Sequence, residues 1–172
     1  MLALGEIAKA LSLAEEGLGL CKESGDMYGR TKALLVLGDV ATAQKDYSFA
    51  RASYEESLAL ARESLPDPQF IAAGLERLAE VVMAQGEPGW AARLWGAAEA
   101  VQEASNFPLT HDHPDRYERA VATAQVQLGK QAFAAAWAEG RTMSLEQVMV
   151  APARHTTPQI GTTSMSTLSS GK

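Results

Sequence analysis

The residues of this 172-residue chain that could bind a metal ion lie close together. They are His111, Asp112, His113 and Asp115. A structural zinc site needs four ligands and a catalytic site at least three from the protein, and the other histidine, His155, lies in a distant Ser/Thr-rich segment. The alternative is a polar loop in which Asp112 or Asp115 supports the start of a helix and Pro114 sits in its first turn. We favour the loop and expect no metal or other cofactor.

Paired carboxylates are the next candidates for chemistry. Glu15 with Glu16 and Glu55 with Glu56 fall on helical segments, where adjacent side chains point about 100° apart and cannot converge as an acid and a base. The chain contains no G-x-S-x-G or H-E-x-x-H motif, and its closest approaches to a P-loop lack the required spacing or the final hydroxyl residue. We therefore expect a protein that is not an enzyme.

Composition points to helices and to a soluble, acidic protein. Hydrophobic residues make up 47% of the chain and aromatic residues only 6%, with Ala and Leu prominent among the former. The formal net charge of −6 argues against direct nucleic-acid contact, which requires clustered Lys and Arg. No stretch approaches the roughly 20 apolar residues of a membrane span. With one cysteine and no signal-peptide pattern, the expected location is the cytoplasm.

The sequence contains an internal repeat, and the repeated segments are the elements that would position any functional site. The stretch 34–57 recurs about 41 residues later, and 50–64 resembles 10–24 at a shift of 40. The first relation is carried by Leu37, Asp39, Val40, Ala43, Gln44, Asp46 and Ala50, which align with Leu78, Glu80, Val81, Ala84, Gln85, Glu87 and Ala91. Self-similarity at this period predicts stacked helical pairs.

We therefore predict an all-α fold, a right-handed superhelix of antiparallel helix pairs. The expected organisation is a helical domain over 1–150, with an incomplete first repeat at 1–24, repeats at about 25–65 and 66–105, and closing helices at 113–150. Within the closing part, a short helix over 131–139 should end at Gly140. Residues 151–172 are rich in Ser and Thr and are expected to be a disordered tail.

One repeat resembles the tetratricopeptide pattern. Leu34, Leu37, Gly38, Ala50 and Tyr54 stand at its spacings, so that Gly38 and Ala50 would let two helices approach while Tyr54 fills space against the following repeat. In the next copy Trp95 takes the place of Tyr54, and Trp90 that of Phe49, all expected to point inward. The period near 40, in place of roughly 34, leaves HEAT-like packing as an alternative.

Longer segments of the chain resemble a more specific group of proteins with helical repeats. AARLWGAAEAVQEA at 91–104 and the run 116–149 are similar to the closing part of the helical arm in bacterial LuxR-type regulators and signal-transduction ATPases. The resemblance covers about 1–150 and implies a sensing or docking arm. Neither the ATPase nor the DNA-binding domain of such regulators lies in this chain.

The same resemblance selects a concave groove on the first helix of each pair. Its positions here are Lys32, Leu35, Asp39 and Thr42, followed by Ala73, Glu76, Glu80 and Met83. Asp39 and Glu80 are aligned copies, so an acidic stripe would favour a basic or hydrogen-bond-donating partner. The alternative is that these residues are only the solvated sides of amphipathic helices.

Three functional hypotheses follow. The first is a module that binds a protein, a peptide or a small-molecule inducer in the groove. The second is self-association through the uncovered face of the helix over 6–23. The third is a metal-dependent activity at His111 and His113.

Overall fold

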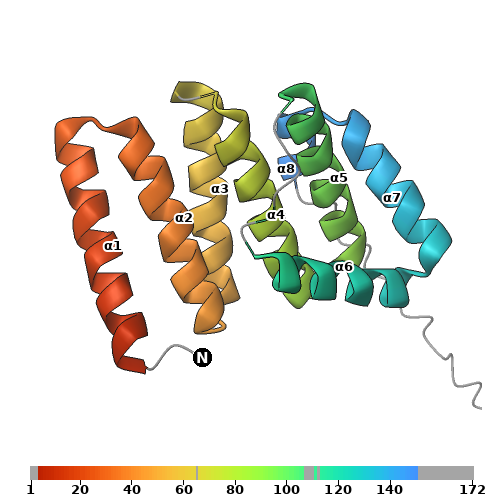
Figure 1. Cartoon of the computed structure of the whole chain (residues 1–172), viewed down its shortest axis with the longest axis horizontal. Coiled ribbons are helices and arrows are strands. Elements are labelled where there is room, and N and C mark those ends of the chain that lie inside the picture. Colours follow the sequence, from red (N-terminus) through yellow and green to blue (C-terminus); the bar gives the residue numbers. More distant parts are fainter. Residues whose placement is uncertain (1–3, 65, 107–110, 112, 151–172) are drawn as a thin grey trace, which may run out of the picture.

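The structure, a computed structural model, describes residues 4–64, 66–106, 111 and 113–150. Within these ranges the chain is all-helical and contains no strand, as the composition and periodicity predicted (Figure 1). Its helices are α1 Leu4–Ser24, α2 Met27–Ala43, α3 Tyr47–Ser64, α4 Pro68–Ala84, α5 Pro88–Ala104, α6 Pro114–Leu128, α7 Lys130–Thr142 and α8 Leu145–Met149. Asp112 and the tail predicted for 151–172 lie outside the described residues.

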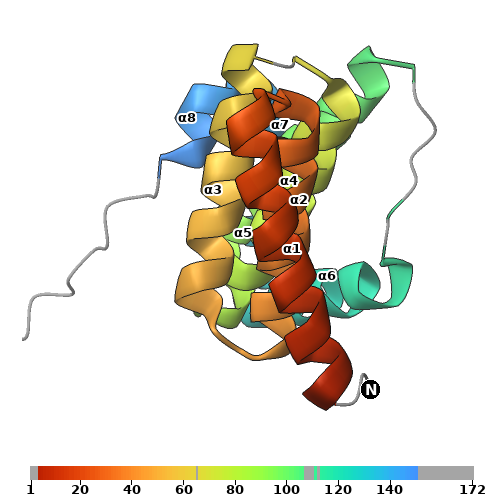
Figure 2. The same ribbon diagram turned by 90° about the vertical axis from the view of Figure 1, so that its left-hand side faces the viewer.

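The first five helices pack in chain order, each against the next. In the view turned by 90°, α3 and α5 lie on one side of the row and α2 and α4 on the other (Figure 2). Helix α6 then runs across the row, and α7 packs directly on α5 (Figure 1). None of the helices in the described ranges combines the length and apolar character that crossing a bilayer requires. The side formed by α2 and α4 contains the residues that the groove pattern selected.

The contact between Gly38 and Tyr54 joins α2 to α3. A Cβ atom on Gly38 would overlap the ring of Tyr54, which is fully buried. The ring therefore covers the glycine of its own helical pair, and Tyr54 also belongs to the core cluster that contains Leu75 and Leu78 of α4. Ala79 and Trp95, the counterparts of Gly38 and Tyr54 in the next pair, are also buried.

One expected helix boundary is wrong. Helix α7 continues through Gly140 to Thr142, whereas glycine at this point suggested a stop. Gly140 lies against the backbone of Arg93 on α5, and Gly96 on α5 lies against the backbone of Trp137 on α7. These two glycines allow the helices to cross in direct backbone contact, so Gly140 belongs to a crossing point and not to a helix end.

The expected inward position of Phe49 is also wrong. Phe49 is 45% exposed, while its counterpart Trp90 is only 2% exposed. Trp90 is covered by α8, because its indole nitrogen Nε1 donates a hydrogen bond of 2.8 Å to the carbonyl oxygen of Val148. The guanidinium of Arg51 lies 4.7 Å from the centre of the Trp90 ring. The sequence repeat thus places the two aromatic residues alike, but only Trp90 has a helix packed over it among the described elements.

Candidate functional site

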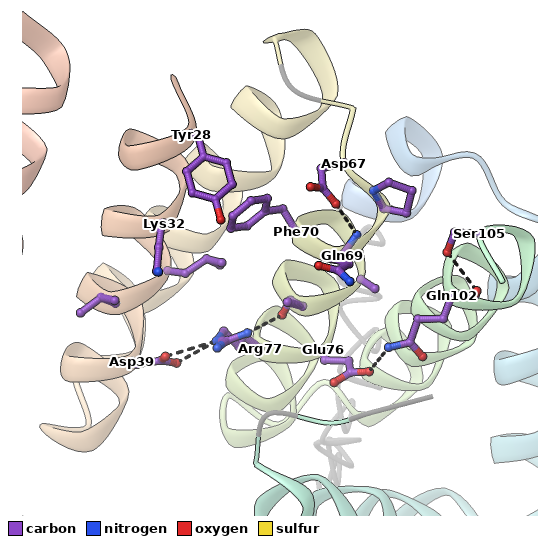
Figure 3. A pocket seen from close by; sticks show the side chains of 15 residues that line it. Tyr28, Lys32, Asp39, Asp67, Gln69, Phe70, Glu76, Arg77, Gln102 and Ser105 are labelled. Carbon is purple, nitrogen blue, oxygen red and sulfur yellow. Dashed lines mark hydrogen bonds and ion pairs between the residues drawn. The ribbon is translucent and has the colours of Figure 1, made fainter. Parts of the chain in front are cut away.

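A pocket of about 480 Å³ lies on α2 and α4 and reaches the end of α5 (Figure 3). It is lined by five of the residues that the groove pattern selected: Lys32, Leu35, Asp39, Ala73 and Glu76. Ten further residues complete the lining: Tyr28, Val36, Asp67, Pro68, Gln69, Phe70, Ala72, Arg77, Gln102 and Ser105. The first helices of two consecutive pairs therefore form one concave surface.

Two aromatic side chains bridge the gap between α2 and α4. The rings of Tyr28 and Phe70 meet edge to face, with centroids 5.0 Å apart and planes at 82°. Each sits in the first turn of its helix. The start of α4 is fixed by Asp67, whose carboxylate accepts a 2.8 Å hydrogen bond from the backbone nitrogen of Gln69. The aromatic pair forms an apolar wall beside polar lining residues.

Asp39 is held in place by two helices. Its carboxylate contacts the guanidinium nitrogen Nε of Arg77 on α4 at 3.1 and 3.2 Å, and accepts a 2.8 Å hydrogen bond from the hydroxyl of Tyr54 on α3. Burial raises the pKa of the Tyr54 hydroxyl, with a further contribution from the charge of Asp39, so the hydroxyl stays protonated and donates. Asp39 therefore links three helices and its charge is balanced.

Lys32 is the contrasting cation of the pocket. It lies on the exposed face of α2, seven residues or about two helical turns before Asp39, and lines the cavity. Among the described residues no carboxylate forms an ion pair with it. Because Arg77 is already paired with Asp39, Lys32 supplies the excess positive charge on the α2 side.

Glu76 forms the opposite side of the pocket. It is 9% exposed, and its oxygen Oε1 accepts a hydrogen bond of 3.2 Å from Nε2 of Gln102. The ring nitrogen Nδ1 of His111 lies 3.0 Å from the same oxygen. His111 in turn stacks on Tyr117 of α6, with centroids 3.7 Å apart and planes at 14°. Glu76 thus connects the pocket to the segment that leads into α6.

The described part of the chain contains no set of side chains arranged to bind a metal ion, as the third hypothesis would require. Three or more His, Cys, Asp or Glu side chains do not gather there in an arrangement that could hold a metal ion. His111 faces Glu76 instead, and His113 occupies the position before α6, where Pro114 lies in the first turn. Asp112 lies outside the described residues.

The remaining groove positions do not line this pocket. Thr42 donates a 2.8 Å hydrogen bond to the carbonyl oxygen of Gly38, and Met83 is buried in the core. Glu80 forms an ion pair of 2.6 Å with Arg116 on α6. Because Asp39 and Glu80 each contact an arginine, the aligned acids do not form the free acidic stripe that the sequence suggested.

The two pairs of adjacent glutamates considered as candidates for acid–base chemistry either form ion pairs with arginines or face water. Glu55 pairs with Arg51 at 2.9 Å, and Glu56 pairs with Arg30 at 2.8 Å. Glu15 and Glu16 are exposed on α1. Exposed ion pairs of this kind contribute roughly 0–1 kcal/mol to stability.

Sequence reasoning missed the aromatic wall and Gln102. Tyr28 and Phe70 do not align at the repeat shift of 41, since Tyr28 aligns with Gln69. Gln102 comes from α5, a second helix, which the groove pattern leaves out. A useful signal was the presence of an aromatic residue in the first turn of both α2 and α4.

A second pocket of about 430 Å³ lies on the other end of the molecule. It is lined by Gln125 of α6 and by Lys130, Phe133, Ala134, Trp137, Ala138 and Arg141. The guanidinium of Arg141 is held by the carboxylates of Glu99 and Glu103 on α5. This surface contains none of the predicted groove residues.

No family model, curated protein or solved structure matches this chain. Function is therefore inferred from the pocket on α2 and α4 and from the chemistry of its side chains.

Proposed function

We propose that this chain is a non-enzymatic sensing or interaction module that binds a partner or an inducer in the pocket on α2 and α4. The observation that carries the proposal is a cavity of about 480 Å³ formed by the first helices of two consecutive pairs. The cavity volume lies within the range of roughly 300–1,000 Å³ typical of small-molecule sites. Eight of the fifteen lining residues are polar or charged, which is more than in a typical small-molecule site and suits a ligand that carries polar groups beside an apolar part.

The mechanism follows from the position of the pocket between two helical pairs. A ligand that contacts both α2 and α4 would favour one angle between the pairs, and the ion pair of Asp39 with Arg77 crosses the same gap. In a right-handed superhelix of tetratricopeptide type, such a change would alter the curvature of the array. We place the module in a LuxR-type or ATPase-linked regulator on the resemblance of residues 1–150.

Filling the pocket with a side chain tests the proposal. Ala73 lies on α4 within the lining and is partly exposed, so Ala73→Trp places an indole in the cavity without replacing a core residue. Ala52→Trp on the exposed side of α3 is the matched control. We expect ligands found by thermal-shift screening of peptides and metabolites to bind wild type and Ala52→Trp, and to lose binding to Ala73→Trp. Ligands that bind all three proteins equally would contradict a role for this pocket.

Self-association is a second candidate because α1 has an uncovered apolar face. Leu13 and Leu20 lie seven residues apart, two helical turns, and are 58% and 60% exposed. A second copy of the chain offers the same face and could cover it in a two-fold arrangement. Sedimentation over a concentration series should then show a rising mass that Leu13→Lys abolishes. A constant monomer mass would end this candidate.

A further inference from the structure

We propose that the pocket on α2 and α4 takes a small zwitterionic molecule with an aromatic body, about the size of a tripeptide. The inference rests on the proposed binding function and adds the chemistry of the ligand. It follows from three features of the pocket: a lysine without an ion pair among the described residues at one side, an aromatic wall, and hydrogen-bond acceptors at the other side.

The positive side belongs to α2. Lys32 is exposed and has no ion pair within the described residues, while the neighbouring charges of Asp39 and Arg77 balance each other. Figure 3 shows Lys32 on the α2 side of the pocket, apart from Glu76 and Gln102. An anionic group of a ligand, such as a carboxylate, is the complement of this lysine.

The aromatic wall lies between the two charged sides. Phe70 and Tyr28 already pair edge to face, and Tyr28 is exposed enough to offer part of its ring to a ligand. The small side chains of Ala72 and Ala73 leave room against α4. An aromatic ring on the ligand would extend the edge-to-face pair, which is a favoured arrangement of aromatic groups.

The acceptor side is formed by α4 and α5. Gln102 is only 8% exposed, and its Nε2 donates to Glu76. Its carbonyl oxygen Oε1 is buried and has no hydrogen-bond partner in the part of the chain that the structure describes. A buried acceptor without a partner is unfavourable, so a small rotation of the Gln102 side chain that brings this oxygen to a ligand's donor group would be stabilised. Together with the carboxylate of Glu76, this side suits an ammonium group.

Charge removal on the ligand provides the direct test. Glycyl-phenylalanyl-glycine carries both charges and an aromatic ring, its N-acetylated form lacks the ammonium, and its C-amidated form lacks the carboxylate. Isothermal titration of the whole chain should show binding of the zwitterion, and about tenfold weaker binding of each blocked form, corresponding to loss of one charged contact.

Two variants assign each charge to its side. Lys32→Gln should remove the preference for the free carboxylate over the amide and leave the preference for the free amine intact. Glu76→Gln should do the reverse. Lys9→Gln, at an exposed position of α1, is the control and should bind all three peptides as wild type does. Thermal melting of each variant confirms that it is folded.

The outcomes separate this inference from the proposed function. Equal affinity for the three peptides, or a preference for the carboxylate that survives in Lys32→Gln, would overturn the zwitterion. If no peptide binds but another ligand is blocked by Ala73→Trp, the inference is wrong and the pocket keeps its role. If no ligand depends on the pocket, both fail.

Discussion

Gly38 has no side chain because the ring of Tyr54 occupies the space where a Cβ atom would be. Glycine inside a helix is less favourable than alanine by about 1 kcal/mol. The compensation here is a fully buried tyrosine whose hydroxyl contacts both Asp39 and Thr42, so that one ring joins α3 to α2 and, through Asp39 and Arg77, to α4. A single pair of residues therefore determines the distance between two helices and supports the edge of the pocket.

Substitution Gly38→Ala tests this joint. The added methyl group overlaps the ring of Tyr54, whose hydroxyl is fixed by two hydrogen bonds, so the ring cannot move away freely. We expect the overlap to outweigh the gain in helix propensity and to lower the free energy of unfolding by about 1–2 kcal/mol. Urea denaturation measures the change.

Gly19→Ala is the matched control on α1. No atom lies within 4 Å of a Cβ at Gly19, and the residue is exposed inside a helix. Alanine there should raise the free energy of unfolding by about 0.5–1 kcal/mol. Stabilisation by both substitutions would show that Tyr54 does not pack on Gly38 as described.

Burial and an ion pair shift the pKa of the Glu80 carboxyl in opposite directions. Burial raises the pKa of its carboxyl, and the nearby charge of Arg116, 2.6 Å away, opposes the rise without cancelling it. A carboxyl with a raised pKa in the folded chain binds its proton more tightly when folded than when unfolded. Its contribution to stability is therefore most favourable at low pH and declines as the pH rises through the raised value.

The variant Glu80→Gln isolates the contribution of the Glu80 carboxyl to the pH dependence of stability. All other titrating groups are shared with wild type, so the difference in unfolding free energy between the two proteins reports mainly on Glu80. From pH 4 to pH 7 we expect wild type to lose stability relative to Glu80→Gln. Urea denaturation at several pH values gives the comparison. A difference that is constant with pH, or that shifts in favour of wild type as the pH rises, would contradict the raised pKa.

At the level of elements, the crossing of α5 and α7 depends on Gly96 and Gly140. Each glycine lies against the backbone of the other helix, near Trp137 and Arg93 respectively. Backbone atoms cannot rotate away as a side chain can, so a methyl group at either position forces the helices apart. The nearby contacts of Arg93 with Glu139 and of Arg141 with Glu99 would be stretched at the same time.

Gly140→Ala should therefore be more damaging than Gly38→Ala. We expect a loss of about 3 kcal/mol in the free energy of unfolding and faster hydrogen exchange in α7. Gly89→Ala, in the first turn of α5, meets only the flexible end of Arg93 at 3.8 Å and should be neutral or mildly stabilising. A neutral effect of Gly140→Ala would mean that α7 does not cross α5 at this point.

The helices themselves could be predicted from the sequence, while their less regular contacts could not. Composition and the sequence repeat predicted an all-α chain, and the described residues are all-helical. Gly140 was misread because a glycine at a helix end and a glycine at a crossing look the same in one sequence. The contact of His111 with Glu76 joins residues 35 positions apart, which no spacing rule predicts.

At the level of the whole molecule, the pocket is a product of how two helical pairs sit together. Lys32, Leu35, Asp39, Ala73 and Glu76, which the tetratricopeptide resemblance selected as groove positions, line one cavity. The resemblance could not show that Asp39 and Glu80 are balanced by Arg77 and Arg116, because those partners come from other helices and follow no common spacing. The sequence suggested an acidic stripe, whereas the structure has a pocket with separated charges. This difference arises from the tertiary structure.

The most direct test of the central claim, that the pocket on α2 and α4 binds a zwitterionic ligand with an aromatic ring, is to map ligand contact by NMR on isotope-labelled protein. On titration with glycyl-phenylalanyl-glycine, the backbone amides of Lys32, Phe70 and Ala73 should show the largest chemical-shift changes, and the changes at Lys32 and Phe70 should be absent in Ala73→Trp. Changes concentrated instead at Lys130, Phe133 and Trp137, which line the second pocket, or no changes at all, would contradict this claim.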